Sequence, residues 1–156
     1  MGIEIERKFL TRSDGWKARA VRSVAVRQGY LARGPEASVR VRVAGDQAWI
    51  TIKGCSSGIS RAEFEYLVPL EDAEQLLEFH CGGRHIAKTR YWVPCAEHTW
   101  EVDVFAGGNS GLVLAEIELQ HADETFVLPD WAGAEVSDDP RYYNAYLAEH
   151  PYREWA

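Results

Sequence analysis

The sequence predicts a single mainly β (α+β) domain over residues 1–156, an eight-stranded antiparallel β-barrel or tunnel with a few outer helices. Three observations predict this fold. Apolar and charged residues alternate with period two along most of the chain, the connections between alternating segments are short, and helical segments are few. Short connections favour antiparallel pairing, because parallel strands need longer crossovers.

The predicted strands follow one another along the chain, separated by turn-rich segments such as Ala-Gly-Asp. They are residues 2–9, 23–32, 38–43, 47–54, 62–69, 86–93, 99–105 and 112–120. Apolar residues at helical spacing predict an outer helix over residues 71–79, and a second, short one is expected over residues 16–21. Asp139 and Pro140 form a cap and first-turn pair for a C-terminal helix.

Composition narrows the class of protein. No segment approaches the roughly 18 consecutive apolar residues of a membrane span. Strand alternation begins at residue 2 without the basic and apolar stretches of a secretory leader, so we expect a cytoplasmic protein. The net charge of −7 argues against nucleic-acid binding. The sequence does not give the oligomeric state, and a homodimer built on the outer apolar surface is compatible with it.

Charged residues gather on one face of the predicted strands. In the first strand Glu4, Glu6 and Lys8 share a face, and Ile3 and Ile5 share the other. The same face carries, on later strands, Arg40 and Arg42, Lys53, Glu63 and Glu65, Lys88 and Arg90, Glu101 and Asp103, and Glu116 and Glu118. Charges of one sign recur at positions i and i+2, where repulsion needs compensation by counterions or ligands.

Two interpretations of this face are open. In the first, the charges point to solvent and form cross-strand ion pairs that contribute about 0–1 kcal/mol each. In the second, the apolar residues face outward under helices and the charges line a central channel. We favour the channel, because selection for solubility alone would mix the two signs along each strand. Eight carboxylates and six cations would then line it.

Such a lining suits a short polyphosphate bound together with divalent cations. Mg²⁺ prefers a few carboxylates together with phosphate oxygens, and arginine and lysine side chains bind phosphate directly. Other catalytic designs are missing from the sequence, which has no GxxxxGK[ST] loop, GxSxG elbow, HExxH or GxGxxG. The charge pattern therefore indicates phosphoryl chemistry on a small anionic substrate.

The opening Glu4-Ile5-Glu6-Arg7-Lys8 resembles the N-terminal ExExK signature of the triphosphate tunnel metalloenzymes, or CYTH domains. The later charged pairs follow the order of that family, and the chain is most similar to its short bacterial inorganic triphosphatases. The resemblance implies that Glu4, Glu6 and Glu118, with Glu116 as a neighbour, bind Mg²⁺ or Mn²⁺. It implies phosphate binding by the basic residues Lys8, Arg40, Arg42, Lys53 and Arg90, with Glu63, Glu65, Glu101 and Asp103 as further tunnel acids.

The expected activity is metal-dependent hydrolysis of inorganic tripolyphosphate to pyrophosphate and phosphate. Alternatives within the family are a class IV-type adenylate cyclase and a nucleoside or thiamine triphosphatase. An alternative of another class is a noncatalytic polyphosphate- or nucleotide-binding module. Tripolyphosphate ranks first because the sequence shows no purine pocket, and so we expect a higher kcat/KM for it than for ATP.

Chemistry indicates which residue accepts the proton of the attacking water. A carboxylate bound to a metal is a poor base, so an inward lysine is the better candidate. We predict Lys88, with Lys53 assisting, because the neighbouring Arg90 favours the neutral amine of Lys88. Crowding of carboxylates also leads us to expect that removal of Glu4 or Glu6 does not lower thermal stability.

Overall fold

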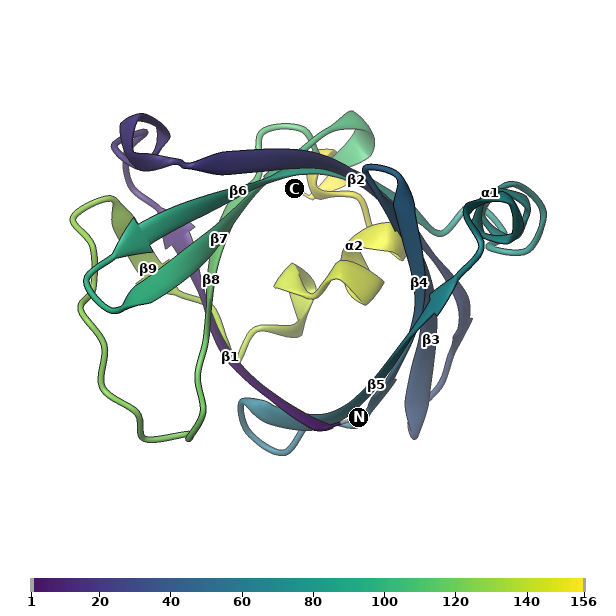
Figure 1. The fold of residues 1–156 in the computed structure, drawn as a ribbon, viewed down its shortest axis with the longest axis horizontal. Helices are drawn as coiled ribbons and strands as arrows, with labels where there is room; N and C mark the ends of the chain where they lie inside the picture. Colours follow the sequence, from purple (N-terminus) through teal and green to yellow (C-terminus); the bar gives the residue numbers. More distant parts are fainter. Residues whose placement is uncertain (1, 156) are drawn as a thin grey trace.

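Eight strands of the computed structural model, which describes residues 2–155, form a closed antiparallel barrel (Figure 1). They are β1 (Gly2–Thr11), β2 (Arg22–Arg33), β3 (Ala37–Ala44), β4 (Gln47–Gly54), β5 (Ser60–Val68), β6 (His85–Cys95), β7 (His98–Phe105) and β8 (Val113–Glu118). Around the barrel they follow the order β5-β4-β3-β2-β6-β7-β8-β1. The predicted fold class is confirmed, and no strand end differs from its predicted position by more than two residues.

Strand β1 closes the barrel because it has a different partner along each half. Its first half pairs with β5, from Gly2 opposite Glu63 onward, and its second half pairs with β8, where Glu6 lies opposite Glu118. A ninth strand, β9 (Ala132–Glu135), pairs with β1 near Phe9. Its Ala-Gly-Ala-Glu sequence has no apolar alternation, so the sequence did not predict it.

The hydrophobic core lies outside the ring of strands. Helix α1 (Leu70–Phe79) confirms the predicted outer helix and packs Ala73 and Leu77 against Val41 and Val43 of β3. On the other side, Trp16, Trp100 and Trp131 belong to a second cluster over β1, β6, β7 and β8. Only a 3₁₀ turn, η1 (Lys17–Arg19), forms where a short helix was expected. The outward position of the apolar residues leaves the inner face to polar groups.

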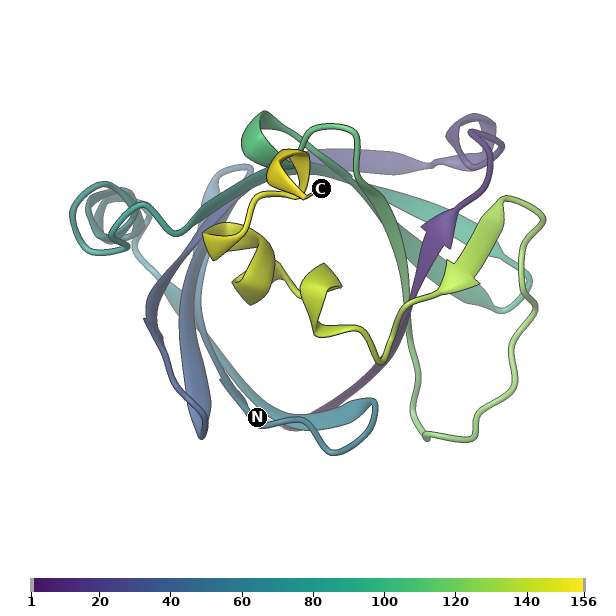
Figure 2. The same cartoon turned by 180° about the vertical axis from the view of Figure 1, so that it is seen from behind.

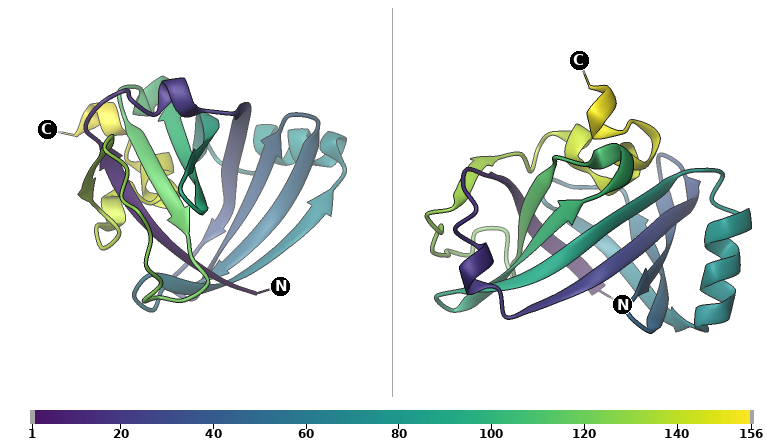
Figure 3. Two further views of the ribbon diagram at one scale, coloured as in Figure 1. Left: turned by 60° about the vertical axis from the view of Figure 1, so that its left-hand side comes forward. Right: turned by 90° about the horizontal axis from the view of Figure 1, so that it is seen from above.

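The C-terminal segment crosses one end of the barrel (Figures 2 and 3). It contains the 3₁₀ turns η3 (Pro140–Tyr142) and η4 (Tyr152–Glu154) on either side of helix α2 (Asn144–Glu149). Asp139 caps η3 as expected, by accepting a hydrogen bond from the backbone N–H of Arg141, but the predicted continuous helix is split in two. An ion pair of 2.7 Å between Arg33 and Glu149 ties α2 to the end of β2.

A further 3₁₀ turn, η2 (Gly107–Asn109), connects β7 to β8 near this covered end. Asn109 is buried, and its side-chain carbonyl accepts a hydrogen bond of 2.7 Å from the backbone N–H of Tyr152. The C-terminal segment is therefore fixed to the barrel by polar contacts as well as by apolar ones. Within residues 2–155, no helix has the length and apolar character needed to cross a membrane.

Candidate active site

A polar cavity of about 200 Å³ lies inside the barrel. Its walls are formed by Glu4, Glu6, Lys8, Arg40, Arg42, Lys53, Arg61, Glu63, Glu65, Lys88, Arg90, Glu101, Glu116, Glu118 and Asn144. All the predicted tunnel residues except Asp103 are in this set. They converge because every strand sends alternate side chains inward and the barrel closes on itself.

Carboxylates crowd the cavity wall formed by β1 and β8. The register places Glu6 directly opposite Glu118, and Lys8 directly opposite Glu116. Burial raises the pKa of Glu6 well above its ordinary value, and the nearby Glu116 and Glu4 raise it further. Burial and the charge of Glu4 also raise the pKa of Glu118. These acids form a compact set of hard oxygen ligands in which like charges repel.

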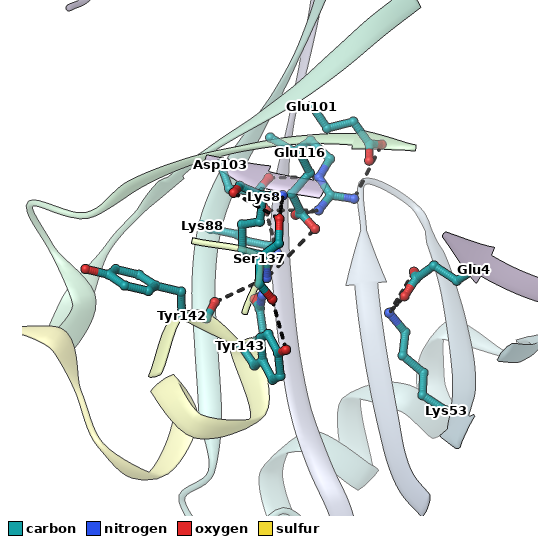
Figure 4. Close-up of polar contacts among 12 residues, drawn as sticks. Glu4, Lys8, Lys53, Lys88, Glu101, Asp103, Glu116, Ser137, Tyr142 and Tyr143 are labelled. Atoms are coloured by element: carbon teal, nitrogen blue, oxygen red, sulfur yellow. Dashed lines mark hydrogen bonds and ion pairs between the residues drawn. The ribbon is translucent and has the colours of Figure 1, made fainter. Parts of the chain in front are cut away.

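Glu4 differs from the other acids because two cations hold it. Lys53 Nζ lies 2.9 Å from Glu4 Oε2, and Arg61 Nε lies 3.3 Å from Glu4 Oε1 (Figure 4 shows the Glu4–Lys53 pair). Burial favours the neutral acid, but Lys53 and Arg61 overcome this effect and lower the pKa of Glu4 to about 2. Lys53 also lies 3.5 Å from Glu63. In this arrangement Lys53 neutralises carboxylates of β1 and β5.

Asp103 lies behind the cavity wall and organises its cations. Its carboxylate is 2.7 Å from Lys88 Nζ (Figure 4 labels both residues). It also accepts hydrogen bonds of 2.8 and 2.9 Å from Arg90. Arg90 also reaches Glu116 at 3.3 Å and Glu101 at 3.5 Å. Asp103 is fully buried, so it orients Lys88 and Arg90 from behind and does not face the cavity.

The pKa of Lys88 is lowered to about 7. Burial is the largest cause, Arg90 and Arg42 act in the same direction, and Asp103 opposes them. A lysine with this pKa is partly neutral near pH 7 and can accept a proton there.

Arginines of β3 crowd the opposite wall. Arg40 Nη2 donates to Thr51 Oγ1 at 3.1 Å, and Arg42 Nε donates to Gln28 Oε1 at 2.9 Å. Burial lowers the pKa of Arg42 to about 9, and the nearby Arg40 and Arg90 contribute to this shift. Among the described residues, the buried Arg40 Nε finds no hydrogen-bond partner. A bound polyanion would reduce the repulsion among these cations and provide acceptors for them.

Three polar residues near the cavity were missed by the sequence analysis. Arg61 shares the inward face of β5 with Glu63, but the predicted strand began one residue too late to include it. Gln28 is uncharged, so a search for charged residues at positions i and i+2 does not find it. Asn144 belongs to α2, outside the barrel strands, and no signal in the sequence places it in the tunnel.

The carboxylates of β1 and β8 do not form a preassembled metal cage. Within residues 2–155, no three carboxylate, imidazole or thiol side chains converge in a geometry that holds a metal ion. Glu4 is turned to Lys53 and Arg61, and Glu116 is turned to Arg90. The donor set itself fits a hard divalent cation, since Glu4, Glu6, Glu116 and Glu118 all line one cavity and a cation would relieve the repulsion that raises the pKa of Glu6.

Comparisons with known proteins agree with this geometry. Residues 2–143 match the CYTH domain family. The chain is 47% identical over 155 residues to an inorganic triphosphatase of Acetivibrio thermocellus, covering 99% of both chains. It is 38% identical over 151 residues to an inorganic triphosphatase of Nitrosomonas europaea, covering 93% of this chain and 96% of that one. The crystal structure of an inorganic triphosphatase, 36% identical, superposes with a TM-score of 0.67 and covers 93% of this chain and 97% of that one.

Proposed function

This chain belongs to the CYTH domain family, and we propose that it is an inorganic triphosphatase that hydrolyses tripolyphosphate to pyrophosphate and phosphate inside its tunnel. One observation carries this function. A single cavity within the barrel brings carboxylates suited to a divalent cation together with the arginines and lysines suited to a polyphosphate chain. Its volume of about 200 Å³ suits a small substrate.

The phosphate chain would lie along the cationic side chains Lys8, Arg40, Arg42, Lys53 and Arg90. The free Nε of Arg40 supports this placement, because a buried donor without a partner costs free energy until an acceptor binds. The mutual repulsion that lowers the pKa of Arg42 supports it as well. Arginine forks bind phosphate oxygens in pairs, which fixes the orientation of the chain.

Mg²⁺ or Mn²⁺ would be held by Glu4, Glu6, Glu116 and Glu118. When bound, the ion neutralises charge on the phosphates and polarises the phosphorus atom that is attacked. The ion would compete with Lys53 and Arg61 for the carboxylate oxygens of Glu4. Both cations would then be free to bind phosphate, so that metal and substrate binding support each other.

Lys88 would act as the general base, with Lys53 assisting. The oxygen of water forms a bond to a terminal phosphorus, the bond from that phosphorus to the bridging oxygen breaks, and the water proton passes to Lys88 Nζ. Pyrophosphate is the leaving group and phosphate the second product. The lowered pKa of Lys88 supports this role, because a fully charged ammonium group could not accept the proton.

Phosphate release from tripolyphosphate, ATP and thiamine triphosphate, each with Mg²⁺ or Mn²⁺, tests this function. We expect the highest kcat/KM for tripolyphosphate, loss of turnover in excess EDTA, and a loss of at least about 100-fold in Glu6→Gln. Glu78→Gln is the matched control, because Glu78 is exposed on α1, outside the tunnel. Cyclic AMP formation from ATP, or full activity in EDTA, would contradict the proposal.

Cytoplasmic location and a homodimer remain predictions of the sequence.

A further inference from the structure

We propose that Asn144 is a positioning residue for Lys88, holding its side-chain amine so that the nitrogen lone pair faces the tunnel cavity. This inference rests on the proposed function and concerns the same site. Asn144 is the first residue of α2 and lies one residue beyond the segment that matches the CYTH family. The covered end of the barrel would then contribute to catalysis as well as to closure.

The contacts of Lys88 determine which way its amine points. Lys88 Nζ donates to Asn144 Oδ1 at 3.0 Å and lies 2.7 Å from Asp103 Oδ2. The centre of the Phe105 ring lies 5.4 Å from Nζ. A neutral amine has two N–H bonds and one lone pair. Asp103 and Asn144 take the two N–H bonds, which leaves the lone pair directed to the cavity that Lys88 and Asn144 both line.

A chain of hydrogen bonds fixes the orientation of the Asn144 amide. Arginine can only donate, so Arg42 Nε requires the carbonyl oxygen of Gln28, which accepts from it at 2.9 Å. The amide nitrogen of Gln28 therefore faces Asn144 and donates to Asn144 Oδ1 at 3.1 Å. Gln28 is fully buried, so its own amide group is shielded from water. Asn144 must consequently present its oxygen, and not its nitrogen, to Lys88.

This network explains why an amide occupies the position. A carboxylate at residue 144 would also accept both bonds, but it would add negative charge beside Lys88 and favour the ammonium form. An apolar side chain would remove one of the two acceptors, Asn144 and Asp103, that orient the Lys88 amine. Asparagine provides the acceptor without the charge, so the amine is oriented and its basicity is kept.

The test compares steady-state kinetics of Asn144→Leu with the parent on tripolyphosphate and Mg²⁺. We expect kcat to fall about tenfold or more while KM changes by less than about threefold, because orientation of the base is lost and phosphate binding is kept. In a Lys88→Ala background the same substitution should cause no further loss, because Asn144 acts through Lys88. Parent-like kcat in Asn144→Leu, or an equal additional loss without Lys88, would overturn the inference.

Asn109→Leu is the matched control. Asn109 is a second asparagine that holds the C-terminal segment, through the backbone N–H of Tyr152, but it is buried and the cavity lining does not include it. This variant should unfold at a lower temperature and keep the parent's kcat. If it lowers kcat as much as Asn144→Leu does, a general disturbance of the segment explains both results and the inference fails.

Asn144→Asp provides a second test, the pH dependence of kcat/KM, which should not change if Asn144 has only a structural role. Around Lys88, Asp103 and Glu116 already favour the ammonium form, and Arg90 and Arg42 oppose it. An added carboxylate should shift the rise of kcat/KM by about one pH unit to higher pH, with activity recovered at alkaline pH. An unchanged pH profile would overturn the inference.

The failure of the inference can be told apart from the failure of the proposed function. A parent protein that releases no phosphate would overturn both. An active parent together with a parent-like kcat in Asn144→Leu would overturn the inference alone.

Discussion

Lys88 is buried and has charged neighbours of both signs, and its pKa of about 7 determines how activity should depend on pH. Only the neutral amine can accept a proton, so its active fraction grows as the pH rises through this pKa. We therefore expect kcat/KM to rise from acid pH through about pH 7 and to level off on the alkaline side. Bound phosphate favours the ammonium form, so the corresponding rise in kcat should lie at higher pH.

Substitution of Lys88 tests this assignment. Lys88→Ala should lower kcat by about 10²-fold or more, change KM little, and flatten the alkaline limb of the pH profile. Lys17→Ala serves as the control, because Lys17 is exposed and forms an ion pair of 3.3 Å with Asp14, away from the tunnel. If Lys88→Ala keeps the parent's kcat and profile at saturating substrate, the base is another group, and Lys53 or Lys8 becomes the next candidate.

Glu4 and Glu6 lie two residues apart on one strand, but the pKa of Glu4 is lowered and that of Glu6 is raised. The sequence led us to expect that removal of either acid does not lower thermal stability, and for Glu4 we now expect a loss, because Lys53 and Arg61 lower its pKa to about 2. A lowered pKa stabilises the fold above the ordinary pKa, and this contribution is lost as the pH falls toward 2. The raised pKa of Glu6 has the reverse sign, so its ionised form destabilises the fold as the pH rises.

At pH 7 and without metal, Glu4→Gln should therefore lower the free energy of unfolding by roughly 1–3 kcal/mol. Glu6→Gln should leave it unchanged or raise it, because the repulsion from Glu116 and Glu4 is relieved. Urea unfolding of both variants beside the parent measures the two effects. Equal losses in the two variants would show that both acids act as simple ion-pair partners.

At the scale of elements, α1 and β2 approach each other so closely that only glycine fits at residue 29. A Cβ atom at Gly29 would lie 2.6 Å from Cys81 Sγ and 3.1 Å from Leu77 Cδ2. Leu77 belongs to α1, and Cys81 follows its end. The helix is thereby seated against the outside of the barrel, on the strand that carries Gln28 on its inner face.

Gly29→Ala should lower the free energy of unfolding by about 1–3 kcal/mol, because the added methyl group overpacks this contact. Gly54→Ala is the matched control in another strand, since the nearest atom to its Cβ would be at an ordinary 3.6 Å. Combining Gly29→Ala with Cys81→Ala should recover part of the loss, which chemical denaturation of the single and double variants can measure. Full stability of Gly29→Ala would show that α1 shifts freely on the barrel.

At the scale of the whole molecule, the barrel inverts the usual distribution of residues. Apolar side chains of the strands pack outward under α1, the segment after β8 and the C-terminal segment, while the interior carries charges. Each buried charge would be costly alone, so the interior charges are arranged in mutual contacts, such as Lys88 with Asp103 and Lys53 with Glu4. These contacts compensate the buried charges of the tunnel in the absence of metal and phosphate.

Period-two alternation in the sequence predicts the eight barrel strands, though not β9, together with the closed antiparallel fold and nearly the whole tunnel lining. Alternation with period two places residues such as Arg40 and Glu116 on one face of each strand, whatever the rest of the chain does. Even the neighbouring-cation argument for a lowered Lys88 pKa could be made from its distance of two residues to Arg90. These are local properties, so the chain order of residues is enough to give them.

Which inward charges meet, and which segment covers the end of the tunnel, depends on how distant parts of the chain pack together. Closure of the ring brings Glu4 close to Lys53 and Arg61 and places Glu6 near Glu116. The period-two pattern puts both acids on the same face and so cannot distinguish them. Asp103 shares the inward face, yet its short side chain is buried behind Lys88 and Arg90. Asn144 reaches Lys88 across 56 residues of chain, from a segment outside the strand pattern. Such contacts depend on how distant segments pack, and no local periodicity records them.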